Sequence, residues 1–139
     1  MYIDKLLEFS DGQALTASGR STDIVDLGSA RQIGVGKPLW IVFQVDVAAD
    51  GTTTDETYEF KIETDSVEAM SSPTELASRT IGYATLVAGY QFTMAVPMEN
   101  VEQFISPYFT LGGTTPSITI SAWLTDQHPQ VWEALPDAL

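Results

Sequence analysis

Apolar and more polar residues alternate one by one along four separate segments, and this two-residue period restricts the fold more than any other feature. The four segments are residues 39–48, 58–63, 91–96 and 118–125. In the first, Ile41, Phe43 and Val45 form an apolar set, and Trp40 belongs to the opposite, mixed set. Because successive side chains of a β-strand point to opposite faces of a sheet, this period predicts strands with one buried face.

Shorter strand candidates lie at residues 22–27, 77–82, 85–88 and 105–111, and turn-forming stretches lie at 34–38, 49–55, 71–73 and 112–116. Helical spacing is absent apart from a possible turn at 4–9 or 97–104. Many short strands separated by Gly-, Pro- and Thr-rich turns predict an antiparallel sandwich. We therefore expect a single all-β domain over 1–139, a jelly-roll-like sandwich of about eight strands.

The two ends of the chain lack the strand pattern. Residues 1–21 carry Tyr2, Leu6, Leu7 and Phe9 without alternation, and 128–139 carries Trp132 among two prolines. We expect an irregular N-terminal arm and an irregular C-terminal tail. Each large apolar side chain left in water forgoes about 1.5–3 kcal/mol, so these side chains dock either on the chain's own sandwich or on a neighbouring subunit.

Charge narrows the range of partners. Six Lys and Arg against nineteen Asp and Glu give a net charge of −13 and a pI near 4.1. Such a field repels phosphate backbones, so we expect no nucleic-acid partner. The acidic surface serves solubility, or it meets a partner with a basic or polar docking face. No apolar run approaches the ~20 residues that span a bilayer, so no membrane partner is expected.

Two absences shape the expected chemistry and compartment. With no cysteine there is no disulfide framework and no Cys-based zinc site. The first residues lack the basic start and apolar stretch of a signal peptide, so we expect an intracellular product.

Catalytic groups are scarce. The one histidine, His128, stands in the tail, and Gly34–Lys37 lacks the spacing of a phosphate-binding loop. We therefore expect no enzyme and no cofactor. Four acids, Asp46, Asp50, Asp55 and Glu56, surround a Gly/Thr-rich loop that has the ligand types for Ca²⁺ but not the EF-hand spacing. A polar hairpin loop without metal is the preferred interpretation.

The three tryptophans, Trp40, Trp123 and Trp132, are candidates for a contact surface. Trp40 and Trp123 occupy the outer register of their strands, opposite the apolar set. Aromatic side chains on such a face favour a protein contact over a second buried layer or a sugar-stacking platform.

Two parts of the sequence resemble the cement (decoration) proteins of tailed-bacteriophage capsids. Residues 7–40 carry the segments EFSDGQALTAS, STDIVDLG and ARQIGVGKPLW, and 104–129 reads FISPYFTLGGTTPSITISAWLTDQHP. Residues 50–100 carry no matching motif. The resemblance implies a jelly-roll homodimer made in the bacterial host cytoplasm. It also implies binding across the seams between major capsid proteins on the outer surface of an icosahedral head, without catalysis.

Within this framework the N-terminal arm (Tyr2, Leu6, Leu7, Phe9) and the tryptophan face are the expected capsid or dimer contacts. Three other functions stay open. A carbohydrate-binding sandwich predicts a concave aromatic face, and a small hydrolase predicts two carboxylates with separated pKa values. A head-completion or tail adaptor protein predicts a ring of fixed copy number.

Overall fold

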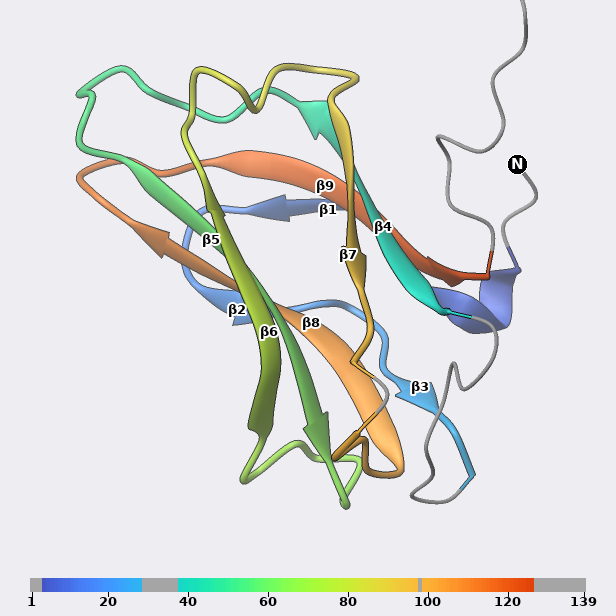
Figure 1. Cartoon of the computed structure of the whole chain (residues 1–139). Coiled ribbons are helices and arrows are strands. Elements are labelled where there is room, and N and C mark those ends of the chain that lie inside the picture. Colours follow the sequence, from blue (N-terminus) through green and yellow to red (C-terminus); the bar gives the residue numbers. More distant parts are fainter. Residues whose placement is uncertain (1–3, 29–37, 98, 127–139) are drawn as a thin grey trace, which may run out of the picture.

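The computed structural model describes residues 4–28, 38–97 and 99–126, and in these it forms nine strands and one short 3₁₀ turn, arranged as a two-layer sandwich (Figure 1). The elements are η1 (Lys5–Leu7), β1 (Glu8–Leu15), β2 (Gly19–Arg20), β3 (Val25–Asp26), β4 (Trp40–Val47), β5 (Thr57–Asp65), β6 (Thr74–Ile81), β7 (Gln91–Ala95), β8 (Phe104–Gly112) and β9 (Ile118–Thr125). None of the described helical residues forms a segment long and apolar enough to cross a membrane.

The strands alternate between two antiparallel sheets. Sheet A has the order β1-β9-β4-β7, and sheet B has the order β2-β8-β5-β6 with β3 also on β8. The first strand therefore pairs with the last, β2 and β3 with β8, β4 with β7, and β5 with β6. This is a long antiparallel ribbon rolled up from its β5–β6 tip, which is the jelly-roll arrangement. The predicted all-β, jelly-roll-like sandwich is confirmed.

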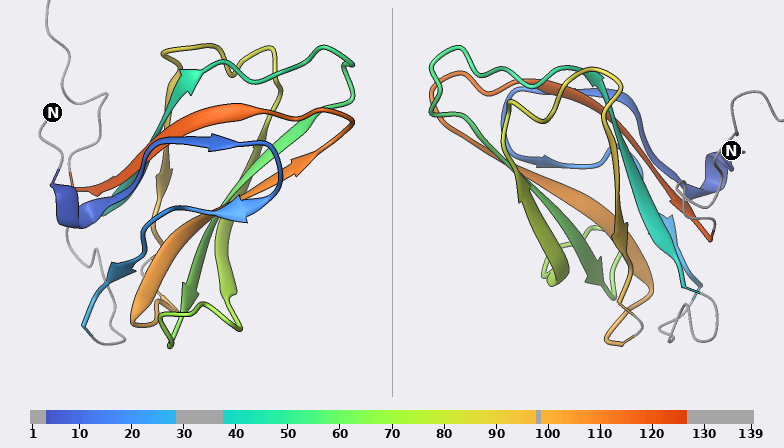
Figure 2. Two further views of the ribbon diagram at one scale, coloured as in Figure 1. Left: turned by 180° about the vertical axis from the view of Figure 1, so that it is seen from behind. Right: turned by 45° about the horizontal axis from the view of Figure 1, so that its top comes forward.

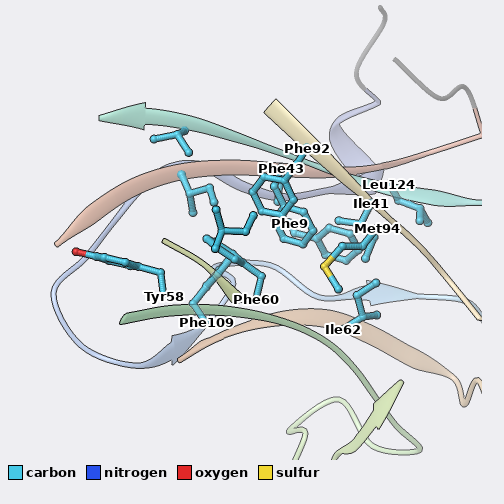
Figure 3. Packing of buried hydrophobic residues seen from close by; sticks show 14 of the residues in the cluster. Phe9, Ile41, Phe43, Tyr58, Phe60, Ile62, Phe92, Met94, Phe109 and Leu124 are labelled. Atoms are coloured by element: carbon cyan, nitrogen blue, oxygen red, sulfur yellow. The ribbon is translucent and has the colours of Figure 1, made fainter. Parts of the chain in front are cut away.

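The core lies between the sheets and is built from the apolar set of each alternating segment. Four phenylalanines meet at its centre (Figure 3): Phe43 stacks on Phe92 with ring centroids 4.9 Å apart, and Phe60 and Phe109 approach edge-on. Phe43 and Phe92 come from sheet A, and Phe60 and Phe109 come from sheet B. Edge-to-face and offset aromatic pairs add to the burial energy, so this cluster joins the two layers.

The prediction of an irregular arm over 1–21 is wrong for its central part, because residues 8–15 form β1 at the edge of sheet A. The strand was missed because it lacks a two-residue period. Phe9 and Ser10 are consecutive and both buried, the pairing with β9 shifts register twice, and Gly12 has φ +61°. Extra residues at β-bulges rotate later side chains out of phase, which hides a strand from periodicity.

Two of the shorter predictions also change. Residues 85–88 form turns, and there Leu86 is fully buried while its carbonyl accepts the Ala49 N–H at 2.9 Å. Only Val25–Asp26 of the predicted 22–27 strand pairs with a neighbour. In both cases a buried apolar side chain made the segment look like a strand, although most of its backbone does not pair with a neighbouring strand.

Candidate interaction site

The turn η1 presents one leucine to solvent and one to the core. Asp4 begins the turn, its carboxylate accepting the Leu6 N–H at 2.9 Å. Lys5 pairs with Glu8 at 2.5 Å, and that hydrogen bond raises the pKa of Lys5. Leu6 is 85% exposed, whereas Leu7 is half-buried against the core. Of the predicted arm contacts, Leu6 is therefore the described side chain most open to a partner.

Phe9 is fully buried in the core and is not available for docking. Strand β1 turns this side chain inward among the other core residues, as Figure 3 shows, so its predicted contact with a partner receives no support from the described structure. Tyr2 and Trp132 lie outside the described residues.

The outer face of sheet A holds a small apolar layer of its own. Val42 and Trp123 face each other across β4 and β9, and Trp40 lies opposite Thr125. Val42 is 0% and Trp123 4% exposed, yet neither belongs to the core cluster between the sheets. The two tryptophans thus occupy the outer register as predicted, but Trp123 is withdrawn from solvent and only Trp40 is partly accessible.

At one end of the sandwich, the β4–β5 and β8–β9 loops are joined by carboxylates and threonines. This loop clasp consists of Asp50, Thr53, Asp55, Glu56, Thr114 and Thr115. Asp55 is its centre: it accepts the Thr53 hydroxyl at 2.5 Å, the Thr114 N–H at 3.2 Å and the Thr114 hydroxyl at 2.8 Å. Figure 2 shows the two loops close together at the same end.

Glu56 lies beneath the clasp and is 4% exposed. Its Oε1 accepts from the Thr53 hydroxyl and from the Thr115 hydroxyl at 3.3 Å, and its Oε2 has no hydrogen-bond partner. The Thr115 hydroxyl also lies 3.4 Å from Asp50 Oδ2.

Hydrogen bonds hold the pKa of each clasp carboxyl below its usual range. For Asp50 the main donor is the Thr52 hydroxyl. For Asp55 it is the Thr53 hydroxyl, followed by the Thr114 hydroxyl. For Glu56 it is again the Thr53 hydroxyl. The ionised form of each carboxyl is the one that binds these donors.

The four acids considered for Ca²⁺ do not act as one group. Asp46 lies apart, on the outer face of sheet A, where it accepts the Ser121 hydroxyl at 2.5 Å and the Gln44 amide at 3.2 Å. In the described ranges no three carboxylate or histidine side chains gather in a way that could hold a metal ion. The remaining three carboxylates instead position the loops.

A polar network covers the outer face of sheet B, and sequence reasoning did not find it. Arg20 donates to Ser106 at 2.8 Å and to Glu63 at 2.7 Å, and its guanidinium lies 5.2 Å from the Tyr108 ring centroid. These residues come from β2, β5 and β8. They come together through two strand pairings, Arg20 with Tyr108 across β2 and β8 and Glu63 with Ser106 across β5 and β8, and no local sequence signal encodes either.

The geometry defines a jelly-roll sandwich with a strongly exposed leucine on η1, two structured outer faces and a hydrogen-bonded loop end. The chain belongs to the Bbp16 family, whose model matches residues 9–124. The matched range runs from β1 to β9 and includes all the described strands. It leaves out only Glu8, the first residue of β1, and Thr125, the last residue of β9.

Comparison with solved structures gives weaker similarities. A chain in the structure of the Gx strain of infectious bursal disease virus is 17% identical with a TM-score of 0.38, and one from the Gt strain is 15% identical with a TM-score of 0.34. Each alignment covers 85% of this chain and only 30% of the viral chain. No curated protein matches the chain significantly.

Proposed function

We propose that this protein is a structural virion protein that binds the outer surface of an icosahedral phage head as a cement protein. In this role it bridges major capsid protein subunits and stabilises the shell. One observation carries the proposal. The two segments that resemble cement proteins, 7–40 and 104–129, are far apart in sequence but supply β1, β2 and β3 together with β8 and β9.

These strands are direct neighbours, since β1 pairs with β9, and β2 and β3 pair with β8. The resemblance therefore covers one contiguous part of the sandwich rather than two unrelated pieces. The segment without a matching motif, 50–100, supplies β5, β6 and β7, of which β6 and β7 are edge strands.

Charge supports a position outside the shell. The four described basic side chains all have an intramolecular partner: Lys5 pairs with Glu8, Arg20 with Glu63, Lys61 with Glu59 and Glu75, and Arg79 lies over the Phe92 ring. The remaining field of the −13 chain is strongly negative. A surface of this kind is repelled by packaged DNA and suits a basic or polar face of the shell.

Bridging needs at least two contact patches. We place one at Leu6 on η1 and one on a sheet face, with homodimerisation doubling each patch by two-fold symmetry. Linking two modest contacts raises the effective affinity without any new contact, so a cement protein needs no large single interface.

The test mixes the purified protein with phage heads that lack it, sediments the particles and counts bound copies per head at increasing salt and temperature. The proposal predicts saturable binding of many copies and heads that survive higher temperatures. A small fixed copy number would instead indicate a head-completion or tail adaptor protein. Absence of co-sedimentation would exclude the cement role on that head.

Leu6→Asp tests the proposed anchor, because it places a charge on a side chain that is 85% exposed and leaves the core intact. Val87→Asp is the matched control, since Val87 is 54% exposed but lies in the β6–β7 connection. We expect Leu6→Asp to weaken sedimentation with heads and Val87→Asp to leave it unchanged. Equal binding by both variants would remove Leu6 from the contact.

A further inference from the structure

The chain contains two Asp–Gly steps, Asp11–Gly12 and Asp50–Gly51, which have the same intrinsic chemistry. In such a step the glycine nitrogen can attack the aspartate side-chain carboxyl carbon, because glycine has no Cβ to obstruct the approach. One C–N bond forms and one water leaves, giving a five-membered succinimide. Hydrolysis by one water then opens the ring at either carbonyl and yields aspartate or isoaspartate, with no net change in atoms or oxidation state.

The Asp11–Gly12 step has room for this ring closure. Both residues are exposed, and they lie in edge strand β1 within the register shift between Ser10 and Gln13, where the ladder is already interrupted. Gly12 has φ +61°, and a Cβ placed on it would meet nothing within 4 Å. The Asp11 carboxylate makes no hydrogen bond to the described residues. It has an electrostatic attraction to Lys5.

The Asp50–Gly51 step is held by hydrogen bonds and by packing. The Asp50 carboxylate accepts the Thr52 N–H at 3.0 Å and the Thr52 hydroxyl at 2.5 Å, which restrains its rotation. Gly51 packs against Tyr83 so closely that a Cβ would lie 2.1 Å from the ring. Swinging the carboxylate back onto the Gly51 nitrogen requires breaking this packing and both hydrogen bonds.

We propose that Asp11 is a site of spontaneous isomerisation through the Gly12 nitrogen, whereas the folded structure protects Asp50. The reaction inserts the aspartate side-chain carbon into the backbone of β1, beside the bond from the Gly12 N–H to the Ser121 hydroxyl at 2.9 Å. Isomerisation at this position therefore loosens the pairing of β1 with β9. The modified residue is a substrate for enzymes that methylate isoaspartyl carboxyl groups.

The experiment ages the folded protein at 37 °C in mildly acidic and neutral buffer and maps isoaspartate by peptide mass spectrometry with isoaspartyl methylation as the probe. The same chain aged in denaturant is the reference. In the folded chain we expect isoaspartate at residue 11 alone. In the unfolded chain we expect it at both residue 11 and residue 50. Equal modification at both residues of the folded chain, modification at residue 50 alone, or none at residue 11 would overturn the proposal.

Ser121→Ala provides a second readout, because the Ser121 hydroxyl accepts the Gly12 N–H and restrains the attacking nitrogen. Removing this hydroxyl is expected to speed isomerisation at residue 11 without changing residue 50. A rate at residue 11 that stays equal or falls would contradict a route through the Gly12 nitrogen.

Discussion

Phe43 contacts the three other phenylalanines of the central cluster: it stacks on Phe92 at 4.9 Å and lies 5.7 Å from Phe60 and 6.3 Å from Phe109. Truncation to alanine removes these contacts and leaves a cavity between the sheets. We expect Phe43→Ala to lower the free energy of unfolding by about 3–5 kcal/mol in urea titrations. Leu6→Ala, at an exposed position, is the control and should change it by less than about 0.5 kcal/mol. Similar losses in both variants would contradict this core.

The loop clasp should make the free energy of unfolding depend on pH in the acidic range. Asp55 and Glu56 have pKa values lowered in the folded chain, so their contribution is complete above the unfolded pKa, near 4, and is lost as the pH falls through the folded values. We expect the free energy of unfolding to fall below roughly pH 4 and this fall to shrink in Asp55→Asn. Asp23→Asn, at an exposed residue outside the clasp, is the control. An unchanged pH dependence in Asp55→Asn would exclude the clasp as its source.

Single residues show where sequence reasoning succeeds and where it stops. The alternating pattern placed Phe43 and Trp40 on opposite faces, because the period of a strand is local. It could not show that Phe9 is buried or that Trp123 is covered, because burial depends on β1 pairing with β9 more than a hundred positions away. The loop clasp was noticed as an acidic cluster, but its threonine donors come from two loops that are distant in sequence.

At the scale of elements, Gly113 determines how closely the two clasp loops approach. It has φ +98°, and a Cβ there would lie 2.6 Å from the Glu56 Cα and 2.7 Å from the Asp55 carbonyl oxygen. We expect Gly113→Ala to cost more than the roughly 1–2 kcal/mol of left-handed strain alone, measured by thermal or urea unfolding. Gly82→Ala, where a Cβ would meet nothing within 4 Å, should be nearly neutral. A neutral Gly113→Ala would show that the loops do not pack this closely.

The strands that sequence predicted well are those with an uninterrupted period. The segment 118–125 became β9 with the same bounds, and 39–48 contains β4. The missed strand, β1, is an edge strand with bulges, and its irregularity has a physical use. An edge exposes unpaired backbone groups, and bulges make it a poor template for unwanted pairing. The bulges that limit unwanted pairing at this edge are therefore also the reason why the sequence of β1 lacks a two-residue period.

At the scale of the whole molecule, repulsion among the negative charges should destabilise the folded state. With −13 charges and its described cations already paired, the folded chain repels itself. Salt screens this repulsion, with a screening length of about 10 Å at 0.1 M. We expect the Tm to rise as sodium chloride is added from low concentration to physiological strength. A Tm that falls would mean that ion pairs such as Arg20–Glu63 outweigh the repulsion.

The rolled ribbon also sets an order in time. Strand β1 ends at Leu15, but its partner β9 begins only at Ile118, so β1 is synthesised long before β9. The β5–β6 hairpin can form as soon as both strands have left the ribosome, whereas β1 has no partner in sheet A until β9 has emerged. Non-local pairing of this kind folds slowly, in milliseconds to seconds for comparable β-proteins. The nascent chain therefore carries Phe9 without its sheet partner until β9 has left the ribosome, and only then can sheet A be completed.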